Sequence, residues 1–208
     1  ALTSFSVVET RNKNNWDFVN HDIYGTGNSN QTIIGKDNVD NLEVKWRLFN
    51  DVEIQDPPIV IGNRDYVQDY AGNILAFDTR TGQLIWKVSA GGGPTMGLAY
   101  DSGVIFASTA SNASIAAVNA TDGKIMWKSH TLGDPKVGYS IDAPPIVWKD
   151  YVIAGSGGSG LPPGTGSVKG NITELNRTNE GEIIWNLETT QGEWVKPGKT
   201  PPNAGPTA

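Results

Sequence analysis

The sequence has 208 residues, of which 25 are Gly and 12 are Pro, and 18% are charged, 38% hydrophobic and 9% aromatic. The Gly and Pro content argues against a fold of long helices, and the aromatic content argues against a disordered chain. The formal net charge of −6, the lack of a basic cluster and the lack of an apolar run of roughly 20 residues argue against a nucleic-acid partner and a membrane span.

Cysteine and histidine leave little room for metal or covalent chemistry. The sequence has no Cys, so disulfides and thiolate ligands are excluded, and two histidines, His21 and His130, are too few for a multi-histidine site. We interpret both as loop residues. We interpret Asp65 and Asp69 as acidic side chains on the solvent face of an alternating strand, with a cation site as the alternative.

In chain order, short β-rich runs and turn residues divide the sequence into six parts. These are a lead segment (1–38), a single strand (39–50), three units of four strands each (51–90, 91–130 and 131–190) and an extended tail rich in Pro and Gly (191–208). The strands predicted within the units are Ile59–Ile61, Tyr66–Gln68, Ile74–Phe77 and Leu84–Val88; Val104–Ala107, Ile115–Val118 and Ile125–Trp127; and Ile146–Trp148, Tyr151–Ala154, Ile172–Leu175 and Ile183–Leu187.

Each unit ends in the same motif, a Gly followed four residues later by a Trp. Gly82 precedes Trp86, Gly123 precedes Trp127 and Gly181 precedes Trp185, while Trp46 supplies an earlier half-copy. The four tryptophans lie 40, 41 and 58 residues apart, which indicates a repeating unit of about 40 residues with an insertion in the last one. The sequence therefore predicts an all-β fold, a partial β-propeller of four-stranded antiparallel blades with tryptophan-docking repeats.

The two residue types of the motif have distinct roles. A Gly between two strands tolerates the positive φ of a tight hairpin, and an indole on the outer strand is large and flat enough to pack on the neighbouring blade. We therefore interpret Trp46, Trp86, Trp127 and Trp185 as residues that dock one blade on the next, with stacking on a ligand as the alternative.

The third unit contains a Gly-rich and Pro-rich insertion at 155–170. The run Gly155–Gly160 has the glycine spacing of a phosphate loop, but Pro162 and Pro163 follow where a helix would have to begin. We interpret this stretch as a flexible insertion between strands. Gly91–Gly93 is interpreted as a loop between blades, with close approach to a ligand as the alternative.

Sequons for N-glycosylation are more frequent than the composition predicts. They begin at Asn30, Asn112, Asn119, Asn171 and Asn176, roughly twice the number expected by chance. The excess favours an exported protein at the cell surface or outside the cell, and an Asn-rich loop composition is the alternative.

The motif Ala-x-Asp-x-x-Thr-Gly-x-x-x-Trp at Ala76–Trp86 resembles the tryptophan-docking repeat of the quinoprotein dehydrogenases, which use pyrroloquinoline quinone (PQQ) to oxidise alcohols. Asn15-Trp16, Tyr24-Gly25 and Ile34–Trp46 resemble the opening segment of that family in order and spacing, and Ala143–Val147 with the Gly-rich run from Gly155 resembles its third full blade. The resemblance covers nearly the whole chain from Asn15 to Trp185.

The resemblance implies an eight-bladed propeller with PQQ and a calcium ion near its axis, where a carboxylate base assists hydride removal from an alcohol. The corresponding positions of this sequence depart from the family's pattern. Gln55 and Ile141 stand where the family has a Glu and a Thr, Met96 lies near the place of an Arg, and Ser159-Gly160 falls where a Glu would bind calcium. The family's pair of adjacent cysteines cannot exist here. We therefore expect a degenerate cofactor site and no cofactor; a variant site for PQQ and calcium is the alternative.

The predicted ring is unfinished. Eight blades of about 40 residues need roughly 320 residues, and the predicted strand at 39–50 belongs to a ring-closing blade whose other three strands are missing. An unpaired strand invites another chain. We therefore expect either a longer polypeptide or a protein partner, a second copy or a different chain, that completes the propeller.

Three functions follow from these observations. The leading hypothesis is an exported quinoprotein-like propeller segment that acts as a non-catalytic binding or assembly module. The first alternative is the N-terminal part of a PQQ-dependent and calcium-dependent alcohol dehydrogenase. The second is a surface filament subunit whose unpaired strand joins the next copy.

Overall fold

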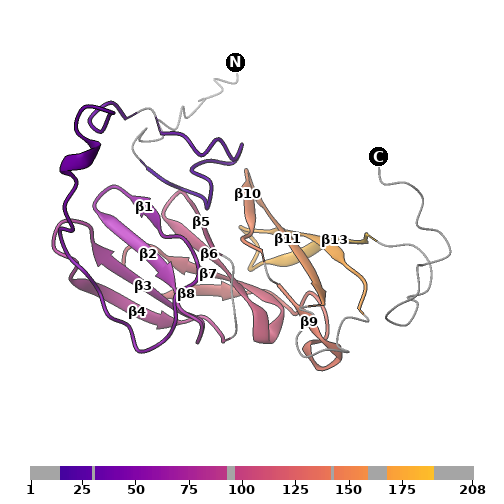
Figure 1. Ribbon diagram of the computed structural model, residues 1–208. Coiled ribbons are helices and arrows are strands. Elements are labelled where there is room, and N and C mark those ends of the chain that lie inside the picture. The colour runs from indigo at the N-terminus through magenta and orange to yellow at the C-terminus, as the bar shows by residue number, and fades with distance from the viewer. Residues whose placement is uncertain (1–14, 30, 93–96, 142, 159–167, 190–208) are drawn as a thin grey trace, which may run out of the picture.

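The chain folds into three antiparallel β-sheets that lie side by side in chain order in the computed structural model (Figure 1). The structure describes residues 15–29, 31–92, 97–141, 143–158 and 168–189. Blade one contains β1 (Ile59–Ile61), β2 (Arg64–Gln68), β3 (Asn73–Asp78) and β4 (Leu84–Ser89). Blade two contains β5 (Leu98–Asp101), β6 (Val104–Thr109), β7 (Ser114–Asn119) and β8 (Ile125–Lys128). Blade three contains β10 (Ile146–Trp148), β11 (Tyr151–Gly158), β12 (Asn171–Asn176) and β13 (Glu182–Glu188), with the short β9 (Tyr139–Ser140) paired to β11.

Each blade is a meander whose strands pair in sequence order. The pairing of the last two strands contains a β-bulge at the same place in every blade, next to Ala76, Ala117 and Glu174. A bulge increases the local right-handed twist of a strand pair. In each blade, the residue just before the bulge is the one that pairs with the tryptophan of the motif. The bulge therefore recurs with the motif.

The hydrophobic core lies between the blades. Alternate residues of each strand point to opposite faces of the sheet, so a blade with neighbours on both sides is apolar on both faces. Blade two has this pattern: Ile105 and Ala107 pack toward blade one, and Phe106 packs toward blade three. The predicted fold class, a partial β-propeller of four-stranded antiparallel blades, is therefore confirmed.

The lead segment runs along the first strands of the blades. The Trp16 amide donates to the Val60 carbonyl at 2.8 Å and the Val60 amide donates back at 3.0 Å, so Trp16 pairs with β1. The Tyr100 amide of β5 donates to the Asp17 carbonyl at 3.1 Å. The segment therefore connects the inner edges of blades one and two.

Three details differ from the sequence predictions. Residues 42–50 form no strand in the described chain and are preceded only by the short 3-10 helix η1 (Val39–Asn41), because a strand needs a paired neighbour and none lies beside them. β11 continues for four residues into the insertion predicted at 155–170, because Gly155 and Ser156 pair with β12 and Gly157 and Gly158 pair with β9. β5 and β9 were not anticipated.

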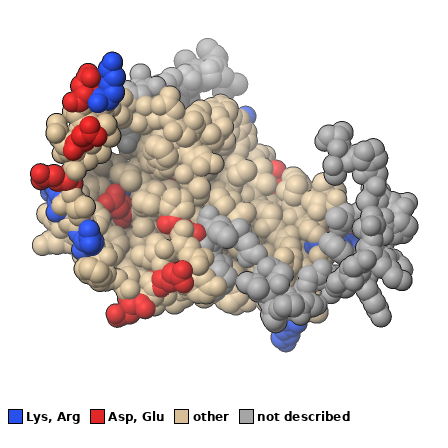
Figure 2. Space-filling model, in the orientation of Figure 1, with Lys and Arg blue, Asp and Glu red and all other residues tan. Residues whose placement is uncertain are grey.

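The charged residues are dispersed. Figure 2 shows Asp, Glu, Lys and Arg as separate patches on a mostly uncharged surface, without a basic patch on the face in view. Among the described residues, no helix has the length and hydrophobicity needed to cross a membrane.

Candidate functional site

Three tryptophans lie on glycines of a neighbouring blade, and these contacts are the most distinctive side-chain arrangement of the molecule. The pairs are Trp46 on Gly82, Trp86 on Gly123 and Trp127 on Gly181. A Cβ added at any of the three glycines would stand 2.6 to 2.7 Å from an indole carbon, closer than real side chains approach. We call each of these three glycines a glycine seat.

Each glycine seat needs Gly for two reasons. The backbone φ angles are 71°, 74° and 71° at Gly82, Gly123 and Gly181, a conformation that side chains disfavour. The indole also occupies the space of a Cβ. The last hairpin of a blade therefore offers a flat backbone surface to the aromatic ring.

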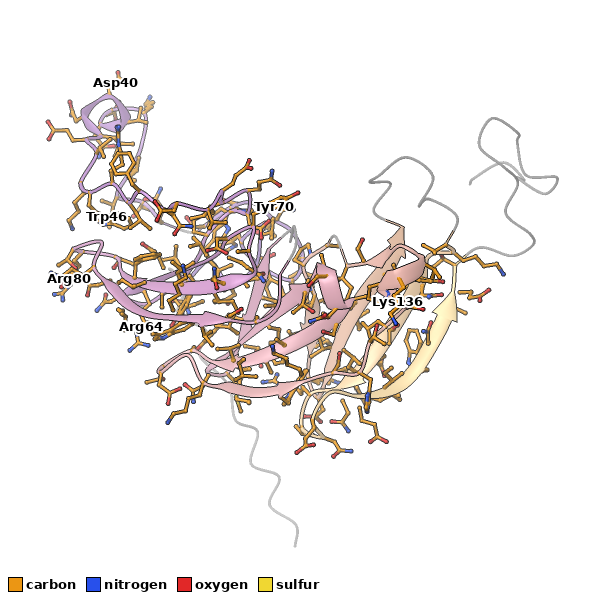
Figure 3. All side chains as sticks on the ribbon, turned by 90° about the horizontal axis from the view of Figure 1, so that it is seen from below. Asp40, Trp46, Arg64, Tyr70, Arg80 and Lys136 are labelled. Atoms are coloured by element: carbon orange, nitrogen blue, oxygen red, sulfur yellow. The ribbon has the colours of Figure 1, made fainter. Side chains whose placement is uncertain are left out.

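The indole nitrogen fixes the ring on its seat. In every pair the Nε1 atom donates to a backbone carbonyl of the turn that carries the seat: Trp46 to Thr79 at 2.9 Å, Trp86 to Ala120 at 3.1 Å and Trp127 to Arg177 at 3.1 Å. A half-buried indole keeps its N–H bonded in this way while its ring excludes water. Figure 3 shows Trp46 between the segment that carries Asp40 and the sheet of blade one.

The fourth tryptophan of the motif has no seat among the described residues. Trp185 lies on β13 at the place that Trp86 has on β4, and 40% of its surface is exposed. The glycine seats of the described chain are all occupied by the other three indoles.

A polar side chain closes the turn below each seat. The Asp78 carboxylate accepts from the amides of Arg80 and Thr81, at 2.9 and 3.0 Å. Desolvation raises the pKa of Asp78, but these bonds, the Thr81 hydroxyl and the Arg80 charge outweigh it and hold the pKa below its ordinary value. Asn119 and Asn176 accept the corresponding amide bonds in blades two and three.

The sequons have different accessibilities. Asn112 is exposed, and Asn119 and Asn176 are half-buried in the turns just described. Asn171 is the first residue of β12, between β11 and β13, with only 8% of its surface exposed, which leaves no room for a glycan on the folded protein. Asn30 lies outside the described residues.

The structure describes two of the degenerate cofactor positions, Gln55 and Ile141. Gln55 is exposed, and its amide donates to a Glu53 carboxylate oxygen at 3.0 Å. Ile141 is fully buried in the core between blades two and three, beside Phe18 and Leu132. Met96, Ser159 and Gly160 lie outside the described residues.

One of these two positions, Ile141, offers no polar group to PQQ or calcium. The Ile141 side chain is an alkyl group enclosed by apolar neighbours, so it offers neither a hydrogen bond to a quinone nor a ligand to a cation. Among the described residues, no group of three His, Cys, Asp or Glu side chains is arranged to hold a metal ion.

Asp69 has a structural environment that differs from the sequence interpretation. Its side chain is buried rather than on the solvent face, and it accepts from the Ala71 amide at 3.0 Å and from the amide and side chain of Asn73. Desolvation raises the pKa of Asp69, but the bonds from Asn73 and Asn50 and the Lys87 charge outweigh it and lower the pKa. These hydrogen bonds to Asp69 close the β2–β3 turn.

Asp65 is half-buried on β2, where desolvation and the nearby Asp78 charge raise its pKa.

A second contact between blades was not anticipated from the sequence. The Arg177 guanidinium of blade three forms an ion pair with Asp101 of blade two and lies over the Phe106 ring, 5.4 Å from its centroid. Arg177 also donates to the Lys149 carbonyl at 3.1 Å. The sequence signal was weak, because the two charged residues are separated by 76 positions.

Comparisons with known proteins agree on the fold. The PQQ_2 family model, described as outer membrane protein assembly factor BamB, matches residues 39–196. No curated protein matches the sequence. Among solved structures, a europium-containing methanol dehydrogenase is 25% identical over 86% of this chain, with a TM-score of 0.74. The quinohemoprotein alcohol dehydrogenase of Comamonas testosteroni is 25% identical over 84%, with a TM-score of 0.71. The quinohemoprotein alcohol dehydrogenase ADHIIG of Pseudomonas putida HK5 is 24% identical over 86%, with a TM-score of 0.75.

The matched region is a minor part of each of those proteins. This chain covers 32% of the methanol dehydrogenase chain and 27% of each quinohemoprotein chain. Three blades of the present structure therefore correspond to a portion of a much longer chain.

Proposed function

This chain belongs to the PQQ_2 family, described as outer membrane protein assembly factor BamB, and forms part of a quinoprotein-dehydrogenase-like propeller; from this premise we propose that it is an exported, non-catalytic binding or assembly module. Its role is to present blade surfaces on which further blades dock. The partner is a protein segment, from the same polypeptide or another chain, that completes the propeller.

One observation carries this proposal: the docking apparatus is present in full, and its last member is unused. Three indoles occupy three glycine seats, whereas Trp185 is exposed together with Leu187, two residues further along the same strand. Exposed apolar surface of this kind is typical of protein contact sites.

The chemistry of the cofactor positions supports a non-catalytic role. In the quinoprotein dehydrogenases that this sequence resembles, the quinone cofactor needs hydrogen-bond donors and a cation. At two of the corresponding positions this chain has the apolar side chain of Ile141 and the neutral side chain of Gln55.

Export to the cell surface is part of the same proposal. The exposed sequon at Asn112, the last residue of the 3-10 helix η2 (Ala110–Asn112), supports it. We expect a glycan there and none at Asn171. Intact mass before and after deglycosylation of protein from its native host measures the occupancy.

The proposal is tested with the purified 208-residue chain, PQQ and calcium. We expect no dye-linked alcohol oxidation and no change in the PQQ absorbance band, because Ile141 offers the cofactor no polar group. The same assay on an active quinoprotein dehydrogenase is the positive control. Stoichiometric PQQ binding with turnover would overturn the non-catalytic role.

The second candidate is the N-terminal part of a PQQ-dependent and calcium-dependent alcohol dehydrogenase. It is favoured by the 25% identity to the methanol and quinohemoprotein alcohol dehydrogenases over most of this chain. The isolated chain covers only 32% and 27% of the dehydrogenase chains and would give no turnover under either candidate, so the two are separated by the same assay on this chain joined to the segment that completes the propeller. A lanthanide ion in place of calcium is an additional condition, since one similar structure contains europium.

A further inference from the structure

The face of blade three that points away from blade two has the architecture of a docking face. In each blade, four residues lie side by side across the strands and end at the tryptophan; we call each set a docking row. The rows are Ile59–Tyr66–Ala76–Trp86 in blade one, Ala99–Phe106–Ala117–Trp127 in blade two and Ile146–Ile153–Glu174–Trp185 in blade three.

The first two docking rows are covered and the third is not. Tyr66 and Phe106, on the second strands of blades one and two, are 2% and 1% exposed because the next blade packs on them. In blade three, Ile146 is 48% exposed and Ile153 is partly exposed. Trp148 and Tyr151 continue the exposed apolar surface on the same face.

The seats argue against a second copy of this chain as the occupant. A fourth blade would have to offer Trp185 a glycine with positive φ in its last hairpin, as Gly123 does for Trp86. In the described chain, Gly82 is already covered by Trp46, and a second copy would bring its own Trp46 with it. The occupant must therefore bring a seat of its own.

One residue of the third row breaks the pattern. Glu174 occupies the place that Ala76 and Ala117 have in the first two rows, directly opposite Trp185. Among the described residues, none forms a hydrogen bond or an ion pair with the Glu174 carboxylate, although its backbone pairs within the sheet. Once another sheet covers the row, its carboxylate loses water, and an unpaired buried charge is strongly destabilising.

We propose that the docking row of blade three binds a fourth four-stranded blade that supplies a glycine seat to Trp185 and a Lys or Arg side chain to Glu174. This inference rests on the proposed assembly function and adds the chemistry of the partner. The pairing of Arg177 with Asp101 between blades two and three shows that this fold accommodates a charge pair between blades.

The test supplies a fourth blade from the chain itself. Ser89 follows Trp86 by three residues, as Glu188 follows Trp185, so a second copy of residues 90–128 inserted between Glu188 and Thr189 continues β13 as β5–β8 continue β4. In this copy, the face that packs on the preceding blade contains Ile105, Ala107, Ala116 and Val118. A surface-displayed library places Ala, Val, Glu, Lys or Arg at those four positions and is selected for protease resistance.

We expect Lys or Arg to be enriched over Ala at one of the four positions by at least about tenfold, since one buried unpaired carboxylate costs more than that factor. In a Glu174→Ala background, the enrichment of Lys and Arg should disappear, and Ala or Val should be the most enriched residue. An equal basic preference in both backgrounds, or none in either, overturns the cation partner while docking stands.

A copy with Gly123→Val, which removes the seat for Trp185, is the control for docking itself. If the copies with and without the seat give the same protease resistance, and hydrogen exchange of the β13 amides is unchanged by every copy, the blade does not dock. That result overturns the proposed assembly function together with this inference.

Discussion

At the scale of single residues, a glycine can be required for its positive φ or because a neighbouring atom occupies the space of a Cβ, and two glycines of this chain separate these two reasons. Gly123 has a φ of 74° and an indole 2.7 Å from its missing Cβ, whereas Gly103 has a φ of 84° and no atom within 4 Å. Both positions disfavour a side chain by conformation, but only Gly123 does so by contact. The difference between the two isolates the contribution of the tryptophan contact.

We therefore expect Gly123→Ala to lower the free energy of unfolding by about 2–4 kcal/mol, because it adds displacement of the Trp86 ring to the strain at positive φ. Gly103→Ala should cost only about 1 kcal/mol, the strain alone. Urea unfolding followed by circular dichroism measures both. Equal losses for the two variants would contradict the role of Gly123 as a seat.

The sequence predicted the seat residues but not their polar surroundings. The Gly and Trp of the motif are four residues apart, so local spacing reveals them. The carbonyls of Thr79, Ala120 and Arg177 that accept the indole N–H belong to other repeats, between 33 and 50 residues away. Such partners follow from the stacking of blades and cannot be read from any single repeat. The burial of Asp69 was missed in part for a similar reason, since one of its partners, Asn50, lies 19 residues away.

At the scale of elements, the sequence predicted most of the strands, but it did not predict which segments pair with them. The strands of blade one were found because each is a short run rich in β-branched and aromatic or other apolar residues between clear turns, as in the Ile-Val-Ile run of β1. β5 (Leu98–Asp101) follows the Gly-rich run at 91–93 and has no β-branched residue, and β9 is only two residues long. The predicted strand at 39–50 has the right alternation but no paired neighbour, and alternation alone does not make a strand.

The contact of blade two with blade three predicts an effect of charge. Arg177 pairs with Asp101 and covers the Phe106 ring, and only 13% of its side chain is exposed. Replacing it by Gln leaves the Asp101 carboxylate without its cation. We expect Arg177→Gln to lower the free energy of unfolding by about 2–4 kcal/mol.

Arg80→Gln is the matched control, since Arg80 makes an ion pair with Asp78 at 3.5 Å but is 70% exposed. That change should stay within about 0.5 kcal/mol, as expected for a surface pair. Thermal unfolding of both variants at two salt concentrations gives the comparison. A loss for Arg177→Gln no larger than that for Arg80→Gln would show that the contact between blades is not a stability determinant.

At the scale of the whole molecule, the two ends of the described blades differ in what they lack. Blade three exposes a complete sheet face, whereas the segment before blade one exposes a single extended stretch. In that stretch Leu42 and Val44 are exposed, although Trp46 beside them rests on blade one. Blade two is therefore covered on both faces, whereas the outer face of blade three and the stretch at 42–44 are exposed.

This asymmetry predicts the pattern of hydrogen exchange. We expect the amides of β6 and β7, paired on both sides, to exchange slowly in the isolated chain, and the amides of 42–49, which have no strand partner, to exchange close to the rate of an unfolded peptide. Mass spectrometry at several protein concentrations measures both regions. Protection of 42–49 that rises with concentration would show that a second copy pairs with this stretch, as in a filament. Strong protection at every concentration would contradict the unpaired strand, because it would require a partner within the same chain.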